Sequence, residues 1–567
     1  MDPGRSNDDA ADDELPLDDL HLDEPGVWTD EAADEVAVGG GRSLLAASAA
    51  PAVGTMLSRL TGLVRVGALT AALGLTSLAD VYNLSNTTPN ILYELVLGGV
   101  LSATLVPLFT QTDADGDEDT ASVLVTVGFV AICALTLLAV LASPAINWLL
   151  ALPLQGAERR RELAIGDDLL ALLLPQILFY GVTTLATAML SARRRFAAPA
   201  FAPVLTNLVT AAAALGVYFF VGTSGSVDTT RSSLWALGLG TTAGVAAMAA
   251  ALVPALRRAD VRLTWQFRPR HPVVGQVARL SGWTVGFAMS NQVALLIVLT
   301  LARRIGTGAL STYQYAAIFF QLPYGLIAVS LMTAVLPELA TAAKDGDDER
   351  FAARFREGLS LLLTFMVPAA AAYLLLGLPL VSLLLGRGQF GTSAVRQTAG
   401  MLAGFSVGLP AFAVFLYCVR AFYARRNTRT PFFLNVGENL VNVVLVVPFT
   451  ALVGRYGLSL AYSVAYWSAA VVAVVAVNRA VPGILTVRTL GLFGRSLAVA
   501  GVVVVVMAGA VWAVRAHLGD VGELVVGLAV GVATFVGAAL VLRPHGFEPL
   551  TDGLRRGAAR RLGRSRS

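Results

Sequence analysis

The sequence predicts an all-α polytopic membrane protein with about fourteen transmembrane helices. The mean hydropathy is +0.69. Hydrophobic residues make up 56% of the 567 residues and charged residues only 14%, whereas soluble domains carry about a quarter charged residues. The apolar runs also recur at about the 20-residue length that one helical crossing of a bilayer requires.

Short polar or charged stretches separate the apolar runs and set the expected ends of the crossings. The longer runs are expected to tilt or to extend beyond the bilayer. Cys133 and Cys418 both fall in apolar runs and are interpreted as small buried hydrophobic residues. The expected spans are 52–74, 81–110, 121–151, 168–191, 201–222, 233–254, 276–302, 310–340, 357–386, 396–420, 432–453, 457–478, 490–514 and 522–543.

The two chain ends carry opposite charge. Residues 1–35 are acidic and lack the basic start of a signal peptide, so we expect a disordered, solvated tail, with a docking or regulatory role as the alternative. Basic residues concentrate in the loops at 191–200, 257–272 and 424–431 and in the C-terminal tail. By the positive-inside rule, both termini are expected in the cytoplasm. The outside loop ERRRE, residues 158–162, runs against this trend.

An internal repeat predicts two related halves. Residues 192–209 and 424–441 both fit Ala-Arg-Arg-x4-Pro-x7-Asn-Leu-Val, and residues 113–119 are echoed by 344–350 at a similar offset of about 230 residues. Matching loops follow an even number of spans, which predicts parallel six-helix lobes that rock around a central site. The predicted division is an acidic tail (1–43), two lobes (44–256 and 257–482), a final helix pair (483–545) and a basic tail (546–567).

Charged residues within the first two spans are the sharpest candidates for a binding site. Arg59 and Arg65 lie about 120° apart around one helix, within one broad face. If both extended to the membrane surface, only Val66 to Ala79 would remain, which is too short to cross. We therefore expect at least Arg65 to line a polar cavity, where guanidinium groups would suit a phosphate-bearing anion. The other candidates for the lining are Asp80, Asn90 and Glu94.

A second candidate site surrounds Glu438, an acid inside an apolar span. Asn439 and Asn442 lie near it in the sequence, and Asn291 is added as a candidate from another span. Carboxylate and amide oxygens suit Na⁺, and a carboxylate alone suits a proton, so we expect either cation as a coupling ion and no other cofactor. A glutamate that only packs between helices is the alternative.

Nothing in the sequence indicates an enzyme. The four histidines lie in tails or loops, so no metal cluster is expected, and the phosphate-binding pattern G-x-x-x-x-G-K-[ST] is absent. Arg420 and the pair Arg303–Arg304 lie near span ends, where extension to the membrane surface is the expected behaviour.

Several motifs, in order, resemble the MurJ (MviN) family of lipid II flippases, within the multidrug/oligosaccharidyl-lipid/polysaccharide exporter superfamily. They are SRLTGLVR and LADVYNLSNTTPNILYE in the first two spans, then APAFAPVLTN, FFQLPYGLIAVSLMTAVLPELA, GQF and FYARRNTRTP. The resemblance covers roughly residues 50–545. It implies fourteen helices in two six-helix lobes with a final pair.

The resemblance also assigns residues to roles. Arg59 and Arg65 match the first-helix arginines that line the family's central cavity, and Asp80 matches an acidic residue after that helix. Other charged cavity positions of the family are occupied here by Tyr93–Glu94, Ile318 and Gln321, so the cavity is expected to be less basic. Gln321 is kept as a candidate for substrate contact.

The resemblance implies a transporter that turns lipid II from the inner to the outer leaflet of a bacterial plasma membrane by alternating access, for cell-wall synthesis. The expected partners are lipid II or a similar polyprenyl-pyrophosphate glycan, membrane lipids and cell-wall synthesis proteins, and no nucleic acid. The alternatives are a flippase for another polyprenyl-linked glycan, a drug/cation antiporter of the same superfamily, and a non-transporting cell-wall scaffold.

Overall fold

The computed structural model describes residues 41–95, 105–221, 231–261 and 263–542. Every regular element in these ranges is a helix, and the described residues form no strand. Of the described residues, 41–49 belong to one unit of the chain and those from 50 to 542 to another. Most of the predicted acidic tail and all of the predicted basic tail lie outside the described residues.

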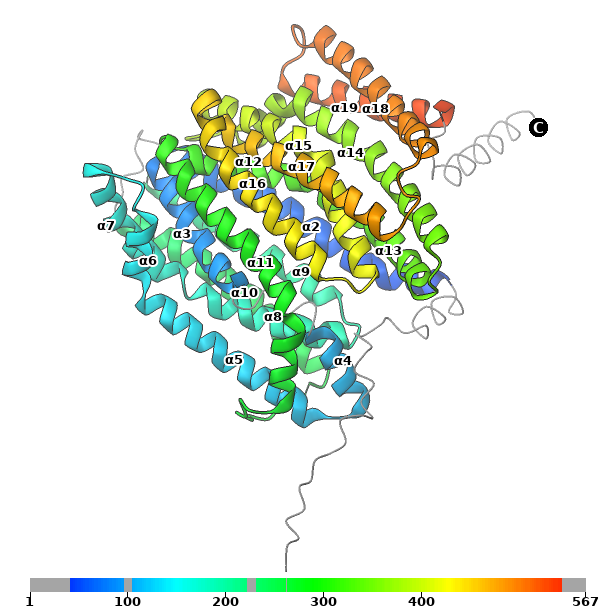
Figure 1. The fold of residues 1–567 in the computed structure, drawn as a ribbon. Helices are drawn as coiled ribbons and strands as arrows, with labels where there is room; N and C mark the ends of the chain where they lie inside the picture. The colour runs from blue at the N-terminus through cyan, green and yellow to red at the C-terminus, as the bar shows by residue number, and fades with distance from the viewer. Residues whose placement is uncertain (1–40, 96–104, 222–230, 262, 543–567) are drawn as a thin grey trace, which may run out of the picture. The chain divides into compact units, whose positions relative to one another are not determined.

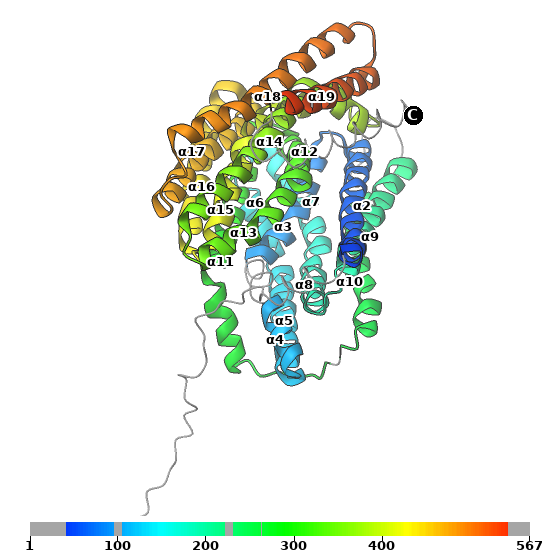
Figure 2. The ribbon, with the colours of Figure 1, turned by 90° about the vertical axis from the view of Figure 1, so that its right-hand side faces the viewer.

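The helices fall in chain order into an N-terminal half and a C-terminal half (Figures 1 and 2). The N-terminal half comprises α2 (Gly41–Leu73), α3 (Ser77–Tyr93), α4 (Val106–Asp115), α5 (Glu118–Leu141), α6 (Ser143–Leu150), α7 (Gly156–Leu173), α8 (Gln176–Ala192), α9 (Ala197–Val221) and α10 (Arg231–Arg258). The C-terminal half comprises α11 (Pro272–Ile305), α12 (Ala309–Pro323), η3 (Tyr324–Ala328), α13 (Val329–Lys344), α14 (Asp348–Leu385), α15 (Thr392–Ala424), α16 (Arg429–Val453), η4 (Gly454–Tyr456) and α17 (Gly457–Ala480). The last two helices are α18 (Val487–Val514) and α19 (Asp520–Leu542).

These helices confirm the predicted fold class of a multi-pass, all-α membrane protein. Twelve stretches of the described residues are long and apolar enough to cross a membrane, and one of them, Arg429–Ala480, contains both α16 and α17. Counting those two helices separately gives thirteen crossings. The predicted span 81–110 would be the fourteenth; it falls on α3 and α4 and, between them, on residues 96–104, which lie outside the described residues.

One predicted loop is wrong. The segment ERRRE, residues 158–162, belongs to helix α7, which begins at Gly156. Three arginines and two glutamates can extend a helix without breaking it, because long charged side chains have good helix propensity. One of these glutamates, Glu162, is buried against another helix and pairs there, so the charges of this segment did not mark a loop.

Burial separates an interior from a lipid-facing surface. Helix α15 is the most enclosed of the candidate spans, with 78% of its most apolar window buried, and it packs on α14, α17 and α12. In α19 the buried share is 17%, and α18 and α19 pack on each other and on α14. Large exposed apolar residues on such helices suit contact with acyl chains.

The repeated sequence motif forms the same structure twice. Arg194 and Arg426, at matching positions, both adopt a left-handed backbone, with φ of 56° and 57°. The asparagine of each motif joins the motif's helix to an early helix of its own half. Asn207 of α9 donates to the Ser58 carbonyl of α2 at 2.9 Å, and Asn439 of α16 donates to Asn291 of α11 at 2.9 Å. The lobe boundaries themselves stay a prediction.

The two similar acidic segments, residues 113–119 and 344–350, each pair with an arginine of the repeated motif. Arg193 pairs with Asp113 at 2.8 Å in the N-terminal half. Arg425 pairs with Asp348 at 2.7 Å in the C-terminal half. Each arginine directly follows a helix, α8 or α15; Asp113 lies in the last turn of α4, and Asp348 is the first residue of α14.

Candidate functional site

The two predicted arginines of α2 have no carboxylate partner in the described part of the chain. No described Asp or Glu lies within 4.0 Å of Arg59 or Arg65. The Arg65 side chain is half-buried, and no described residue hydrogen-bonds to its Nε. An uncompensated guanidinium inside a membrane helix is costly unless water or a ligand solvates it.

Arg59 reaches the other half of the chain. Its side chain is exposed, and one Nη atom lies 3.0 Å from the position that a Cβ would take at Gly325 of η3. Only glycine allows this close approach without moving the guanidinium. Asn90 and Gln321 are also exposed and Glu94 is half-buried. Among the described residues, no hydrogen bond or ion pair joins these three to either arginine.

Asp80 occupies a different place from the arginines. It is 6% exposed, and its carboxylate accepts hydrogen bonds from the Gly308 amide at 2.6 Å, the Ser311 amide at 2.9 Å and the Ser311 hydroxyl at 2.7 Å. Asp80 therefore caps the start of α12, where free amide groups and the helix dipole favour an anion. Gly308 adopts a left-handed backbone with φ of 80°, which presents its amide to the carboxylate.

Further polar contacts continue along the same two helices. Asn83 donates to the Ser311 hydroxyl at 2.9 Å and to the Tyr315 hydroxyl at 3.0 Å. Gln314 donates to Thr87 at 3.0 Å. The α3 positions 80, 83 and 87 lie on one helix face, so they form a single line of contact with α12. We call these contacts the α3–α12 seam.

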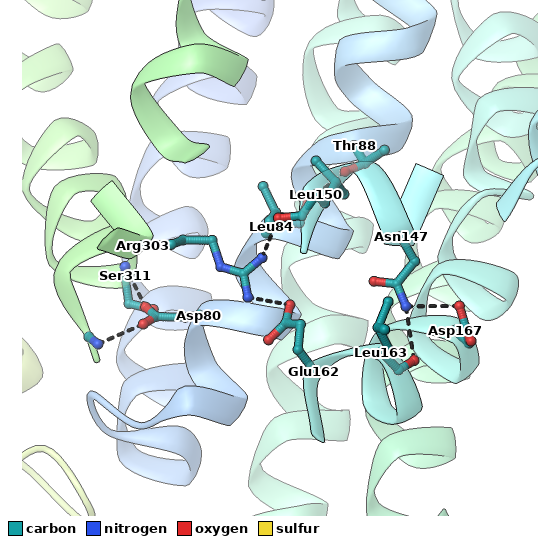
Figure 3. A network of polar contacts seen from close by, with 11 residues as sticks. Asp80, Leu84, Thr88, Asn147, Leu150, Glu162, Leu163, Asp167, Arg303 and Ser311 are labelled. Carbon is teal, nitrogen blue, oxygen red and sulfur yellow. Dashed lines mark hydrogen bonds and ion pairs between the residues drawn. The ribbon is translucent and has the colours of Figure 1, made fainter. Parts of the chain in front are cut away.

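Beside the seam, a buried ion pair joins the two halves. Arg303 of α11 pairs with Glu162 of α7 at 2.6 Å, and the two side chains are 3% and 7% exposed. Arg303 also donates to the Leu150 carbonyl at the end of α6, at 2.9 Å. Figure 3 shows Arg303 between Asp80 and Glu162. We call the contacts of Arg303 the Arg303 latch.

The latch corrects the prediction that Arg303 extends to the membrane surface. A partner is available to it inside the protein, so its charge is compensated without reaching water; only Arg304 is exposed. A pocket of about 310 Å³ lies next to the latch and the seam. It is lined from both halves, with Glu158 and Arg161 among its charged residues. Sequence reasoning missed this cluster, although the unexpected charges at 158–162 were a signal for it.

The predicted cation residues are only partly brought together. Asn439 bonds to Asn291, as described above, and to the Ser290 hydroxyl at 3.3 Å. Glu438 is 2% exposed, and no described residue hydrogen-bonds to its Oε1. The Asn442 Oδ1 also lacks a described partner, and positions four apart share a helix face.

Two buried acceptor oxygens without donors fit a small cation or, at the carboxylate, a proton. Among the described residues, no group of three or more His, Cys, Asp and Glu is placed to hold a metal ion, so a site here would depend on one carboxylate and neutral oxygens. Such a ligand set suits Na⁺ better than a transition metal.

The position of Arg420 relative to the membrane surface stays a prediction. This side chain lies near the end of α15 and is half-buried. Tyr324 of η3 packs on Phe412 of the same helix α15, with ring centroids 4.8 Å apart.

Comparisons with known proteins agree with this architecture. The family described as "Lipid II flippase MurJ" matches residues 69–529. A lipid II flippase MurJ of Burkholderia cenocepacia is 28% identical over 417 residues, which cover 72% of this chain and 79% of that protein.

Solved structures show a similar fold. A lipid II flippase MurJ in an inward closed conformation aligns with a TM-score of 0.72 at 20% identity, over 88% of this chain and 99% of that one. A multidrug resistance MATE family transporter in an inward-facing conformation aligns with a TM-score of 0.65 at 13% identity, over 75% of this chain and 95% of that one.

Proposed function

The chain belongs to the lipid II flippase MurJ family, and on that premise we propose that it moves lipid II from the inner to the outer leaflet of a bacterial plasma membrane. The observation that carries this proposal is the contrast between its arginines. Arg303 is neutralised by Glu162, whereas Arg59 and Arg65 have no described carboxylate partner. A cation that the protein leaves unpaired at membrane depth suits an anionic ligand, and the pyrophosphate of lipid II supplies one.

The transport cycle that we propose is alternating access between the two halves. With both termini in the cytoplasm, the start of α12 lies at the outer end of the bundle. In this state the α3–α12 seam and the Arg303 latch close the outer end. Arg59 and Arg65 can then bind substrate that enters from the cytoplasmic side. Release to the outer leaflet requires both sets of contacts to break. Helices α18 and α19, which pack on α14, would guide the polyprenyl tail, and no covalent chemistry is needed.

We propose that cation binding at Glu438 and Asn442 drives the reset. Both oxygens, which have no partner among the described residues, lie on α16, and α16 packs on α11 and α17. Binding Na⁺ or a proton would neutralise the buried carboxylate, and neutralisation changes how these helices can pack. The unpaired arginines do not favour a drug/cation antiporter, whose cationic substrates they would repel.

Depletion of the protein in its host, with lipid II on the outer leaflet measured by its accessibility to an impermeant probe, tests the proposal. We expect depletion to remove accessible lipid II and a wild-type copy to restore it. Copies with Arg59→Ala or Arg65→Ala should fail, while the exposed control Arg304→Gln should rescue. Normal lipid II exposure after depletion would refute the substrate, and rescue by both alanine variants would refute the site.

A further inference from the structure

The connection between the two halves contains a non-helical segment that lies along α5. Between the end of α10 and the start of α11 the chain passes beside α4 and α5 (Figure 2). We call residues 263–270 of this connection the strap. Val261 before the strap and Val273 after it both pack on the apolar cluster that contains Val123 of α5. Both ends of the strap are therefore held against the N-terminal half.

Two hydroxyls of α5 bind the backbone of the strap. The Thr264 amide donates to the Ser122 hydroxyl at 3.2 Å. The Gln266 amide donates to the Thr126 hydroxyl, also at 3.2 Å. Four helical residues rise about 6.0 Å and two extended residues about 6.6 Å, so an extended strap matches the spacing of the hydroxyls. In an extended chain, alternate side chains lie on opposite faces.

The two faces of the strap differ in polarity. On one face, the Gln266 side chain donates to Asp119 of α5 at 2.7 Å and to the Thr264 hydroxyl at 3.1 Å. The alternate positions hold three large apolar side chains that are 42%, 69% and 52% exposed: Leu263, Trp265 and Phe267. The strap is thus amphipathic with the two-residue period of an extended chain.

The position along α5 places the strap at a membrane surface. Helix α5 is apolar enough to cross a membrane, and its 24 residues span about 36 Å. A hydrocarbon core of about 30 Å is shorter than this helix, so the first turn of α5 extends beyond the core. Ser122 and Thr126 lie about 6 and 12 Å from the start of α5, next to the level at which acyl chains meet headgroups. Their hydroxyls satisfy backbone amides at a level where little water is available.

The matching connection in the C-terminal half buries its apolar residues. Between α17 and α18, the Gly483 carbonyl accepts a hydrogen bond at 2.7 Å from Arg356 of α14. Val481 and Ile484 in this connection are both 0% exposed. The apolar side chains of the strap have no such cover among the described residues. A bilayer surface can cover them, since amphipathic segments insert their apolar face about 5–10 Å into the boundary between headgroups and acyl chains.

Charge around the strap favours a leaflet with anionic lipids. Residues 257–272 contain five arginines and one aspartate. In the proposed topology this loop lies on the cytoplasmic side, where anionic headgroups attract basic residues beside the membrane. Arg268 and Arg270 of the strap are exposed and follow directly after its apolar positions.

We propose that the strap is a membrane-surface anchor that binds anionic phospholipids. Leu263, Trp265 and Phe267 enter the boundary between headgroups and acyl chains, and the two arginines of the strap bind headgroup phosphates. The anchor holds the start of α11 at the membrane surface, because the strap leads directly into that helix. This inference goes beyond lipid II transport and does not depend on it.

The fluorescence of Trp265 in nanodiscs tests the insertion. Trp265→Phe keeps an aromatic ring against Phe129, whose centroid lies 6.3 Å from that of Trp265. The difference between wild type and this variant isolates the emission of Trp265 from that of the other tryptophans. We expect phosphatidylcholine brominated on the upper part of its acyl chains to remove most of this emission, and aqueous iodide to remove little.

Emission that brominated lipid does not quench overturns the anchor. Quenching by iodide would then show that the strap lies in water, and quenching by neither would show that protein covers it. Thermal melting of the variant shows whether it is folded.

Lipid charge tests the two arginines. The preference for anionic lipid is the ratio of Trp265 quenching by brominated phosphatidylglycerol to quenching by brominated phosphatidylcholine at the same low fraction. We expect wild type to prefer phosphatidylglycerol, and Arg268→Gln with Arg270→Gln to lower the ratio by about fivefold for each arginine. The exposed control Arg304→Gln should leave it unchanged. Equal quenching in wild type, or an unchanged ratio in the double variant, overturns the binding of anionic lipid.

Substitutions on α5 test how the strap is held. Ser122→Ala with Thr126→Val removes both hydroxyl acceptors, so hydrogen exchange at the Thr264 and Gln266 amides should accelerate by about fivefold. Thr136→Val is the matched control, because its hydroxyl donates to a carbonyl of α5 itself, and it should leave both amides unchanged. Unchanged exchange in the double variant overturns the placement of the strap on α5.

Discussion

Removing the acid of the Arg303 latch should open the end of the bundle that it closes. In Glu162→Gln, Arg303 stays buried at 3% side-chain exposure but loses its only described ion-pair partner. Breaking a buried ion pair by removing one partner destabilises a structure by about 3–5 kcal/mol. In a state with the halves separated at this end, Arg303 would be hydrated. The variant therefore destabilises the closed state alone.

The expected population shift follows from that difference. About 3–5 kcal/mol corresponds to a change of roughly two to three and a half orders of magnitude in the ratio of open to closed molecules. The remaining Leu150 carbonyl bond and the α3–α12 seam persist in the variant, so we expect a shifted equilibrium and a folded protein.

A cysteine reporter at the start of α12 measures this shift. The native thiols are removed with Cys133→Ala and Cys418→Ala, and Ala309, which is fully buried beside Gly308, is replaced by cysteine. The rate of labelling by a polar maleimide in nanodiscs then reports opening, independently of orientation. Glu162→Gln should label much faster than the parent.

Two further variants make the test specific. Glu158→Gln removes an exposed acid of the same pocket and should label at the parental rate. The double replacement Arg303→Met with Glu162→Leu leaves no buried charge without a partner, so this variant should label more slowly than Glu162→Gln. Labelling of Glu162→Gln at the parental rate would refute the latch.

Three other changes test separate parts of the structure. Gly325→Ala places a methyl group 3.0 Å from the flexible end of Arg59, so the protein should fold but expose less lipid II than wild type and more than Arg59→Ala; a normal level of lipid II would contradict the contact. Glu438→Gln should abolish stabilisation by Na⁺, which for a bound site is about 2.7 kcal/mol at 100 times the dissociation constant; an unchanged difference in melting temperature between Na⁺ and choline would argue against this cation site. Asp117 caps α5 by accepting from the Thr120 amide at 2.9 Å, and the hydroxyl and amide of Thr120 lower the pKa of its carboxyl. Asp117→Ala should therefore increase hydrogen exchange in the first turn of α5, by about 1 kcal/mol of opening free energy at neutral pH. Because the folded-state pKa is lowered, this stabilisation is lost as pH falls through it, whereas Asp117→Asn should keep the cap at all pH values.

Length and polarity were enough to predict the helices, but not how charged residues pair. The apolar runs predicted the spans because crossing a bilayer requires a minimum number of apolar residues. The repeated motif was also informative, since Asn207 and Asn439 form matching contacts. Patterns of this kind are local in the chain, so a sequence displays them directly.

The contacts of buried charges depend on distant segments. Arg303 and Arg304 are neighbours near the same helix end, and only packing decides that the first pairs with Glu162 while the second stays exposed. Asp80 was expected beside the arginines, but its oxygens accept from residues 228 and 231 positions later. The spacing of these residues in the sequence does not show which charges pair inside the protein and which stay exposed.

Helix α12 connects the outer end of the proposed transport path to the π turn η3. The start of α12 and Tyr324 are about 24 Å apart at 1.5 Å of rise per residue. A tilt of about 10° at the π turn would therefore move Gly308 and Ser311 by about 4 Å relative to Asp80, which is more than a hydrogen bond tolerates. Such leverage would convert a small rearrangement of η3, where Arg59 lies against Gly325, into separation of the seam.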